Sequence, residues 1–144
     1  MNKRVISFFL ILSVIISFNL FIVGAATNTS KVKITIKLDS IECIENNHVG
    51  NEWGFGCKVN KKELSEGDSI TISTTSSGKI TIVSKAEEDD SIPDIGSKTL
   101  SISVSKLKVN KEATYTSQVT VTENRGRYSG NTAVWKFTYK VKRS

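Results

Sequence analysis

Residues that catalytic and metal sites need are scarce in this chain of 144 residues. There is one histidine, His48, and there are two cysteines. A catalytic triad needs a histidine base beside its nucleophile, but His48 stands among asparagine, valine and glycine, and no Gly-x-Ser-x-Gly turn occurs. A zinc site takes about four ligands, mostly histidine and cysteine, and the phosphate-binding pattern Gly-x-x-x-x-Gly-Lys is absent. The sequence therefore predicts a protein that is not an enzyme, and a small hydrolase is the last of our hypotheses.

A nucleic-acid-binding surface is not indicated either. The formal net charge is +6, but the lysines mostly alternate with apolar residues, as Lys31, Lys33 and Lys37 do, and no arginine cluster with interleaved aromatic residues occurs. A moderately basic surface favours anionic polymers or lipids. We expect an unidentified protein or an anionic surface as the partner, no nucleic acid, and a monomer.

The first 26 residues have the order of a secretory signal peptide. Lys3 and Arg4 precede an apolar run from Val5 to Val23, and the small residues 24–26 follow, as is typical of a cleaved export signal. The run is nearly long enough to span a bilayer, so an uncleaved membrane anchor is the alternative. We expect a single domain, residues 27–144, that is secreted or associated with the cell envelope. The abundance of lysine, asparagine, isoleucine and serine is interpreted as bacterial origin.

From Lys31 onward, apolar and polar residues alternate with a period of two. The run KVKITIKL places every second residue on an apolar face, as in a half-buried strand, and a change of phase at residues 39–40 indicates a bulge. Similar runs, separated by turn residues, follow at 53–59, 69–74, 79–86, 98–104, 114–123 and 132–141. Seven to eight such strands without a helical period predict an all-β fold, an antiparallel β-sandwich.

The two cysteines, Cys43 and Cys57, are equally far from Gly50 in the sequence. A hairpin centred on Gly50 would place them opposite each other, with Cβ atoms about 4.5–5.5 Å apart. A small adjustment from that distance allows a disulfide, and export makes one permissible. We predict a structural Cys43–Cys57 disulfide, with two buried free thiols as the alternative.

The stretch 87–97, EEDDSIPDIGS, is the one concentration of acidic residues. Glu88 and Asp90 lie on the same side of an extended chain, and Asp94 returns toward them after the turn at Pro93. Neighbouring carboxylates repel each other unless a cation offsets their charge, and calcium takes about six to eight oxygen ligands. The stretch predicts a calcium site, with a solvated acidic turn as the alternative.

A Gly-rich loop near the C-terminus is the candidate for partner binding. Loops of a sandwich cluster at its ends, and this one, ENRGRYSGN, presents Arg125, Arg127 and Tyr128 near its tip. Arginine and tyrosine are enriched at binding hot spots. The alternative is a structural loop whose two arginines pair with the acidic stretch and replace an ion there.

Two short motifs carry a resemblance to a known family. The stretch NNHVGNEWGF resembles a ligand loop of the form Asp-x-x-Gly-x-Ser-Asp-Pro-Tyr, and EDDSIPDIGS resembles a later loop with Asp-x-Asp. Both loops belong to the C-two domain, the calcium-dependent phospholipid-binding sandwich of protein kinase C and synaptotagmin. The resemblance implies a C-two-like topology, although an immunoglobulin-like one is also open. It implies calcium ligands at Glu88, Asp90, Asp94, Asn47 and Glu52.

The leading hypothesis is therefore an exported bacterial β-sandwich that acts as a binding module. Calcium at the acidic end would order the loops, which would then recognise a surface, envelope or protein partner. The alternative is an exported inhibitor or immunity-type protein that binds an enzyme through the Arg125–Tyr128 loop without a metal.

Overall fold

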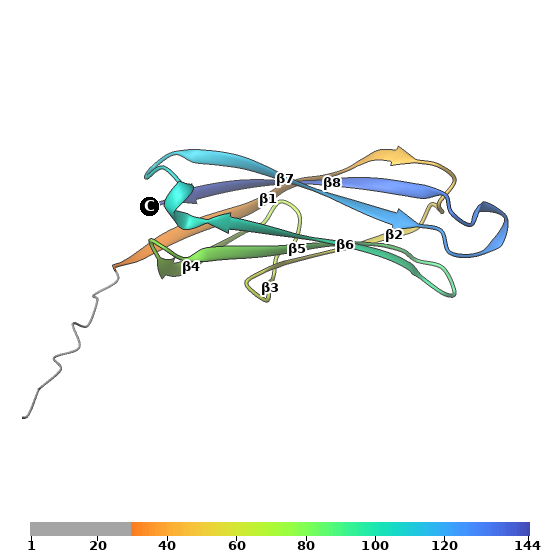
Figure 1. Ribbon diagram of the computed structural model, residues 1–144, viewed down its shortest axis with the longest axis horizontal. Helices are drawn as coiled ribbons and strands as arrows, with labels where there is room; N and C mark the ends of the chain where they lie inside the picture. The colour runs from red at the N-terminus through yellow and green to blue at the C-terminus, as the bar shows by residue number, and fades with distance from the viewer. Residues whose placement is uncertain (1–29) are drawn as a thin grey trace, which may run out of the picture.

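Two antiparallel four-stranded sheets pack face to face in the described structure (Figure 1). The computed structural model describes residues 30–144, so the predicted signal peptide lies outside the described residues. One sheet has the order β4-β1-β8-β7 and the other β3-β2-β5-β6. The prediction of an all-β sandwich with seven to eight strands is confirmed. The elements are β1 (Lys31–Asn46), β2 (Trp53–Val59), β3 (Lys62–Glu63), β4 (Ser69–Thr75), β5 (Lys79–Glu88), β6 (Asp94–Ser103), η1 (Val104–Lys106), β7 (Glu112–Thr122), η2 (Gly126–Tyr128) and β8 (Thr132–Arg143).

The strands form where the alternation of apolar and polar residues predicts them. In β1 the residues Ile34, Ile36 and Leu38 are buried, and the register against β8 shifts between Leu38 and Ser40, where the change of phase predicts a bulge. The shift keeps apolar residues facing the second sheet after the bulge, since Ile41 pairs with the buried Phe137. Among residues 30–144, no helix is long and apolar enough to cross a membrane.

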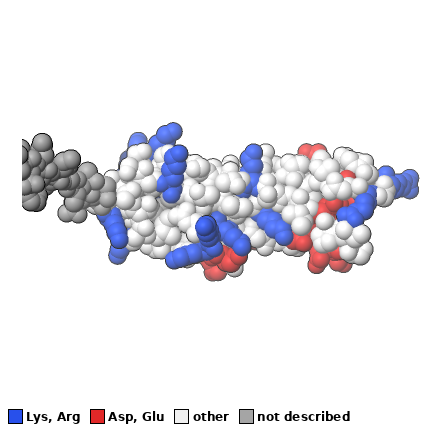
Figure 2. All heavy atoms as spheres, turned by 60° about the horizontal axis from the view of Figure 1, so that its bottom comes forward, with Lys and Arg blue, Asp and Glu red and all other residues white. Residues whose placement is uncertain are grey.

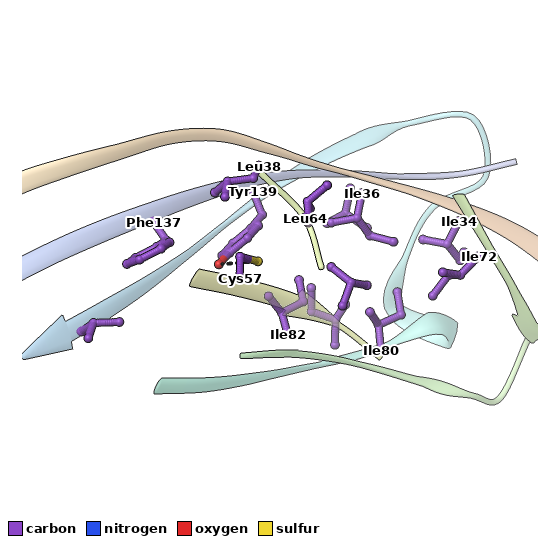
Figure 3. Packing of buried hydrophobic residues seen from close by; sticks show 14 of the residues in the cluster. Ile34, Ile36, Leu38, Cys57, Leu64, Ile72, Ile80, Ile82, Phe137 and Tyr139 are labelled. Atoms are coloured by element: carbon purple, nitrogen blue, oxygen red, sulfur yellow. Dashed lines mark hydrogen bonds between the residues drawn. The ribbon is translucent and has the colours of Figure 1, made fainter. Parts of the chain in front are cut away.

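The core between the sheets is mainly aliphatic, with one polar group at its centre (Figure 3). Tyr139 on β8 is fully buried, and its hydroxyl lies 2.8 Å from Ser84 Oγ on β5 and 3.5 Å from Cys57 Sγ on β2. A buried hydroxyl costs free energy unless it has a hydrogen-bond partner. The Tyr139–Ser84 pair therefore satisfies both groups and joins the two sheets.

The inward face of β5 leads from this core to one end of the molecule. Its buried residues follow each other at every second position: Ile80, Ile82, Ser84, Ala86 and Glu88. The row is apolar at its start and ends with a carboxylate. Glu88 thus occupies a core position in the strand, although its side chain is ionisable.

β6 and β7 approach each other closely at the side of the sandwich. A Cβ atom at Gly96 would overlap the backbone of Thr120, so only glycine allows this approach. The contact brings the start of β6 and the end of β7 together. Asp94, the first residue of β6, therefore lies beside the loop that follows β7.

The predicted hairpin and disulfide are wrong. β1 and β2 are consecutive in sequence, but they lie in different sheets. Cys43 pairs with Trp135 of β8, whereas Cys57 pairs with Ser84 of β5. The chain between them crosses from one sheet to the other, so the two residues are not cross-strand neighbours, and both are free cysteines, with Cys43 exposed and Cys57 buried.

The loop within the acidic stretch is also shorter than predicted. Glu87 and Glu88 are the last residues of β5, and Asp94 is the first of β6. Glu88 and Asp94 are direct cross-strand partners. The alternation of β5 continues into the acidic residues, so only residues 89–93 form the turn, and two of the carboxylates, those of Glu88 and Asp94, are buried.

Candidate functional site

Three loops meet at one end of the sandwich, which we call the loop end. They are residues 47–52 between β1 and β2, residues 89–93 between β5 and β6, and residues 123–131 between β7 and β8 (Figure 1). Figure 2 shows a group of acidic side chains at this end, on the right of the view, with basic side chains beside them at the tip and further basic side chains along the rest of the visible face. These three loops contain most of the residues that the sequence predicted to bind a metal ion or a partner.

Glu88 is the innermost carboxylate of the loop end. Its side chain projects from the inward face of β5 and is only 7% exposed. Its Oε2 atom is buried and has no hydrogen-bond partner among the described residues. Gly50, which has a φ of 41°, lies directly against the carboxylate, because a Cβ atom there would overlap Glu88 Oε1. The glycine is therefore needed both for its conformation and for the space that it leaves to Glu88.

Asp94 is the second buried carboxylate, and its hydrogen bonds differ from those of Glu88. It is 2% exposed. Asn124 donates to it twice, from Nδ2 to Oδ1 at 2.6 Å and from the backbone amide to Oδ2 at 3.3 Å. Both carboxylate oxygens of Asp94 thus have a partner from the β7–β8 loop. Asp94 therefore fixes that loop against β6.

The other three predicted metal ligands lie nearer the surface. Asp90 Oδ1 accepts a hydrogen bond of 2.7 Å from the backbone amide of Ile92, which closes the β5–β6 turn. Asn47 Oδ1 lies 3.3 Å from His48 Nδ1. Glu52 is exposed, and its backbone carbonyl accepts from the amide of Asp89 at 2.7 Å. All three residues are at the loop end, but the contacts of Asp90 and Asn47 are local ones within their own loops.

A pocket of about 570 Å³ opens between the loops. We call it the loop-end pocket. It is lined by Asn46, His48, Gly50, Asn51, Glu88, Glu123 and Tyr128. Two of these residues are carboxylates and none is a lysine or an arginine, so the lining favours a positively charged ligand.

An aromatic pair forms one wall of the loop-end pocket. The rings of His48 and Tyr128 stack with their centroids 5.2 Å apart and their planes 18° from parallel. The guanidinium carbon of Arg127 lies 5.7 Å from the centre of the Tyr128 ring. The stack joins the β1–β2 loop to η2, so it determines the width of the pocket between these two loops.

The two arginines do not neutralise the acidic residues. Arg125 donates to the backbone carbonyl of Ile92 at 3.3 Å, and Arg127 lies over Tyr128. In residues 30–144 every ion pair with an Asp or Glu is made by a lysine. The alternative in which Arg125 and Arg127 replace a cation is therefore not what the structure shows.

The acidic residues of the loop end disfavour the ionised form of Glu88. Burial raises the pKa of its carboxyl above the usual range, and the negative charges of Asp90, Glu123, Asp94 and Glu52 raise that pKa further. Both causes disfavour the ionised form. A positive charge placed in the loop-end pocket would act in the opposite direction.

The predicted set of five ligands does not form a ready cage for a metal ion. Among residues 30–144, no three His, Cys, Asp or Glu side chains gather closely enough to hold one. Calcium takes about six to eight oxygens, so acidic side chains alone would not complete its coordination here. Glu88 alone among the predicted ligands both lines the pocket and has a free buried oxygen.

Four residues of the site are not predicted from the sequence to belong to it. Asn46, Glu123 and Asn124 are in the sequence only oxygen-bearing residues of two loops, and nothing there indicates that Asn124 caps Asp94. His48 stands out only as the single histidine of the chain. The buried position of Glu88 has a signal, since the alternation of β5 reaches it when continued by two residues beyond Ala86.

Comparison with known proteins gives a fold likeness and little else. No family model matches the chain, and no curated protein does. Similar solved structures include the first C-two domain (C-two A) of plant extended synaptotagmin 1, with 9% identity and a TM-score of 0.47 over 78% of this chain and 94% of that one. This neighbour is a C-two domain, the family that the two loop motifs resemble.

Human GIVD cytosolic phospholipase A2 is similar to the same extent. One structure of it has 9% identity and a TM-score of 0.47 over 80% of this chain. Another, in complex with a methyl γ-linolenyl fluorophosphonate inhibitor and terbium chloride, has 8% identity and the same TM-score. The match spans only 16% and 18% of those chains. Similarity at this level says nothing about ligands, so the functional argument rests on the geometry of the loop end.

Proposed function

We propose that this protein is a binding module, not an enzyme, and that it takes up a cationic group in the loop-end pocket. The observation that carries the proposal is the carboxylate of Glu88, which is buried, lines the pocket and leaves Oε2 without a partner among the described residues. An unsatisfied buried polar group costs about 1–3 kcal/mol, and more when it is charged. Such a group is explained when it serves a ligand that supplies the missing interaction.

Calcium is the metal ion to test first, because the acidic loop predicts it from the sequence. Glu88 would be its anchoring ligand, and the neighbouring Asp90 and Glu123 act on Glu88 strongly enough to raise its pKa. The loops would have to bring further oxygens toward Glu88, since no three acidic side chains gather there in the described structure. Calcium binding would thus be coupled to an ordering of the loop end.

The partner and the location of the protein are part of the proposal. Neutralising the acidic loop end would leave a predominantly basic molecule, since Lys and Arg outnumber Asp and Glu even without Lys3 and Arg4, which favours an anionic surface. The sequence of residues 1–26 supports export and attachment or release at the cell envelope. The alternative of a metal-free enzyme inhibitor is not favoured, because it leaves the buried Oε2 of Glu88 without an explanation.

The test is a thermal melt of the purified protein in millimolar calcium chloride and in chelator. A ligand that binds only the folded state raises stability, by about 2.7 kcal/mol at a hundredfold excess over its dissociation constant. We expect a rise of several degrees in the wild type that is absent in Glu88→Gln. Glu87→Gln is the matched control, since Glu87 precedes Glu88 on β5, faces outward and pairs with Lys85.

The outcomes distinguish two questions: whether calcium is the ligand, and whether Glu88 is part of its binding site. A calcium shift of equal size in wild type and Glu88→Gln would place the ion elsewhere. The absence of any calcium shift would remove calcium as the ligand. The proposed cation site itself would be contradicted if neither calcium nor the ammonium compounds described below bound to it.

A further inference from the structure

We propose that the loop-end pocket is shaped for a primary ammonium group on an alkyl chain, as in a lysine side chain or a polyamine. Glu88 would accept from the ammonium group, and the stacked rings of His48 and Tyr128 would line its alkyl part. This inference rests on the proposed function, since it names the class of cation that the same pocket takes.

The size of the pocket favours an organic cation over a bare ion. Its volume is about 570 Å³, and sites for small organic ligands typically occupy about 300–1,000 Å³. A calcium ion needs oxygens at about 2.3–2.6 Å on all sides, and no three His, Cys, Asp or Glu side chains of the described residues gather to begin such a shell. An alkylammonium ion fits within this space with room for water, and it needs few charged partners.

The carboxylates of the pocket provide the charge that such a ligand needs. Glu88 and Glu123 both line it. Oε1 of Glu123 accepts a hydrogen bond of 3.2 Å from the backbone amide of Arg125, which holds that side chain near the rim. Glu88 is deeper and keeps Oε2 free. An ammonium group has three donors, so it can serve Glu88 and still donate to a second acceptor.

The geometry at Glu88 favours an ammonium over a guanidinium group. A guanidinium group binds a carboxylate best through two parallel hydrogen bonds that use both oxygens. Gly50 lies against Oε1 of Glu88 and crowds that oxygen, while Oε2 is buried and has no hydrogen-bond partner among the described residues. A compact point charge on a flexible stem suits a single acceptor at the bottom of a pocket.

The aromatic wall suits the stem of the ligand. Lysine-like chains place their methylene groups along apolar surface while the charged head seeks a polar site. Tyr128 and His48 present such a surface beside the two carboxylates. One face of the Tyr128 ring stacks on His48, and Arg127 lies over the ring as well. The rings therefore contribute contact area, and the charge recognition is left to Glu88.

The experiment is a titration of the isotope-labelled protein, followed by amide chemical shifts, with n-butylammonium chloride, with n-butanol as the neutral probe of similar size, and with calcium chloride. Butylammonium is expected to give saturable shifts that centre on Gly50, Glu88 and Tyr128, and butanol is not. Glu88→Gln should weaken butylammonium binding by about tenfold or more, equivalent to the loss of one charged hydrogen bond. Glu87→Gln should bind as the wild type does.

A second variant separates this inference from a metal site. Tyr128→Ala removes the aromatic wall and leaves the carboxylates, so it should weaken butylammonium binding several-fold and leave calcium binding unchanged. Spermidine and the peptide acetyl-Gly-Lys-Gly-amide, titrated in the same way, distinguish the two sources of the ammonium group, because the natural class should bind more tightly than butylammonium.

Two results would overturn the inference, and they differ from failure of the proposed function. If calcium gives saturable shifts at Glu88 and butylammonium behaves as butanol does, the site is a metal site and the inference is wrong. If butylammonium binds equally well to Glu88→Gln, the ammonium group lies elsewhere. If neither cation binds at the pocket, the proposed function is wrong as well.

Discussion

Ser84 and Glu88 are two inward-facing polar residues of the same strand, and they differ in whether their hydrogen-bonding groups are satisfied. Ser84 is fully buried, and its hydroxyl is paired with Tyr139 at 2.8 Å. Glu88 is almost as buried, but one of its oxygens has no partner among the described residues, and burial and neighbouring charges raise its pKa. The hydroxyl of Ser84 helps to hold the two sheets together. Oε2 of Glu88 has no partner within the described chain.

The nearby Asp94 shows that the loop end is able to satisfy a buried carboxylate. Asn124 donates to both of its oxygens. Glu88 is the direct cross-strand partner of Asp94, yet it receives no such donor. The unsatisfied charge on Glu88 is therefore not a general property of this end, and the contrast identifies one position as the acceptor of the proposed ligand. The following predictions test this contrast.

The largest effect is expected where the satisfied polar group is removed. Tyr139→Ala leaves a cavity between the sheets, and such truncations of large aromatic side chains typically cost about 3–5 kcal/mol. Tyr139→Phe keeps the ring and leaves Ser84 without its partner, which should cost about 1–2 kcal/mol. Urea unfolding of the three proteins measures both. A loss below about 0.5 kcal/mol for Tyr139→Phe, the size of an ordinary surface substitution, would show that the Ser84 pair does not contribute as we describe.

A smaller loss is expected where the satisfied carboxylate loses its partner. Asn124→Ala removes the shorter of the two hydrogen bonds to Asp94, and this should cost about 1–3 kcal/mol. The β7–β8 loop should also become more open, with faster amide exchange in residues 123–131. Asn131→Ala in the same loop serves as the control in both measurements. Equal stability of Asn124→Ala and the wild type would contradict the role assigned to Asn124.

The pH dependence of stability should differ between Glu88 and the surface acids. The folded state raises the pKa of Glu88, so the unfavourable charge disappears and stability rises as pH falls through that pKa. The pKa values of Asp39 and Glu42 are lowered by hydrogen bonds, chiefly from Lys37 and from Lys136 respectively, so those contributions are lost as pH falls.

Thermal melts of the wild type and Glu88→Gln in chelator isolate the contribution of Glu88. The surface acids contribute equally to both proteins, so they cancel in the difference between the two melting temperatures. At pH 7 we expect Glu88→Gln to have the higher melting temperature, and the gap of a few degrees to narrow as pH falls through the raised pKa of Glu88 and to vanish near the ordinary glutamate pKa of about 4.3. The remaining carboxylates around Glu88, namely Asp90, Asp94, Glu52 and Glu123, are present in both proteins. A gap that stayed constant over this range would mean that Glu88 does not titrate differently in the folded state.

The smallest effect is expected at Cys43. It is exposed and free, so Cys43→Ser should change the melting temperature by less than about one degree. A thiol reagent should label Cys43 in the folded protein, whereas the buried Cys57 should react only after unfolding. Labelling of neither thiol in the folded protein, with two thiols appearing after reduction, would restore the disulfide that the structure contradicts.

Most of the fold was predictable from the sequence, because a period of two is a local signal. The strands around Ile34, Ile82 and Phe137 follow from alternation alone, as does the bulge after Leu38. The pairing of strands is not local. Two cysteines placed symmetrically about Gly50 suggested a hairpin, but β1 and β2 lie in different sheets, and that choice depends on the whole chain.

The site was predictable in part for the same reason. The approach of Asp94 to Glu88 follows from a strand, a turn at Pro93 and a returning strand. The unequal satisfaction of the two carboxylates does not, because it depends on where the β7–β8 loop places Asn124. The stack of His48 on Tyr128 likewise joins residues far apart in the sequence, and no local pattern indicates it.

The decisive measurement is the stability of Glu88→Gln in the absence of any cation, measured at pH 7 in chelator beside the wild type and Glu87→Gln. If the Glu88 carboxylate is an uncompensated buried charge kept for a ligand, Glu88→Gln melts a few degrees above the wild type, while Glu87→Gln does not. If Glu88→Gln melts below the wild type, the carboxylate is already satisfied within the fold, and the loop-end pocket loses the group on which its proposed function rests.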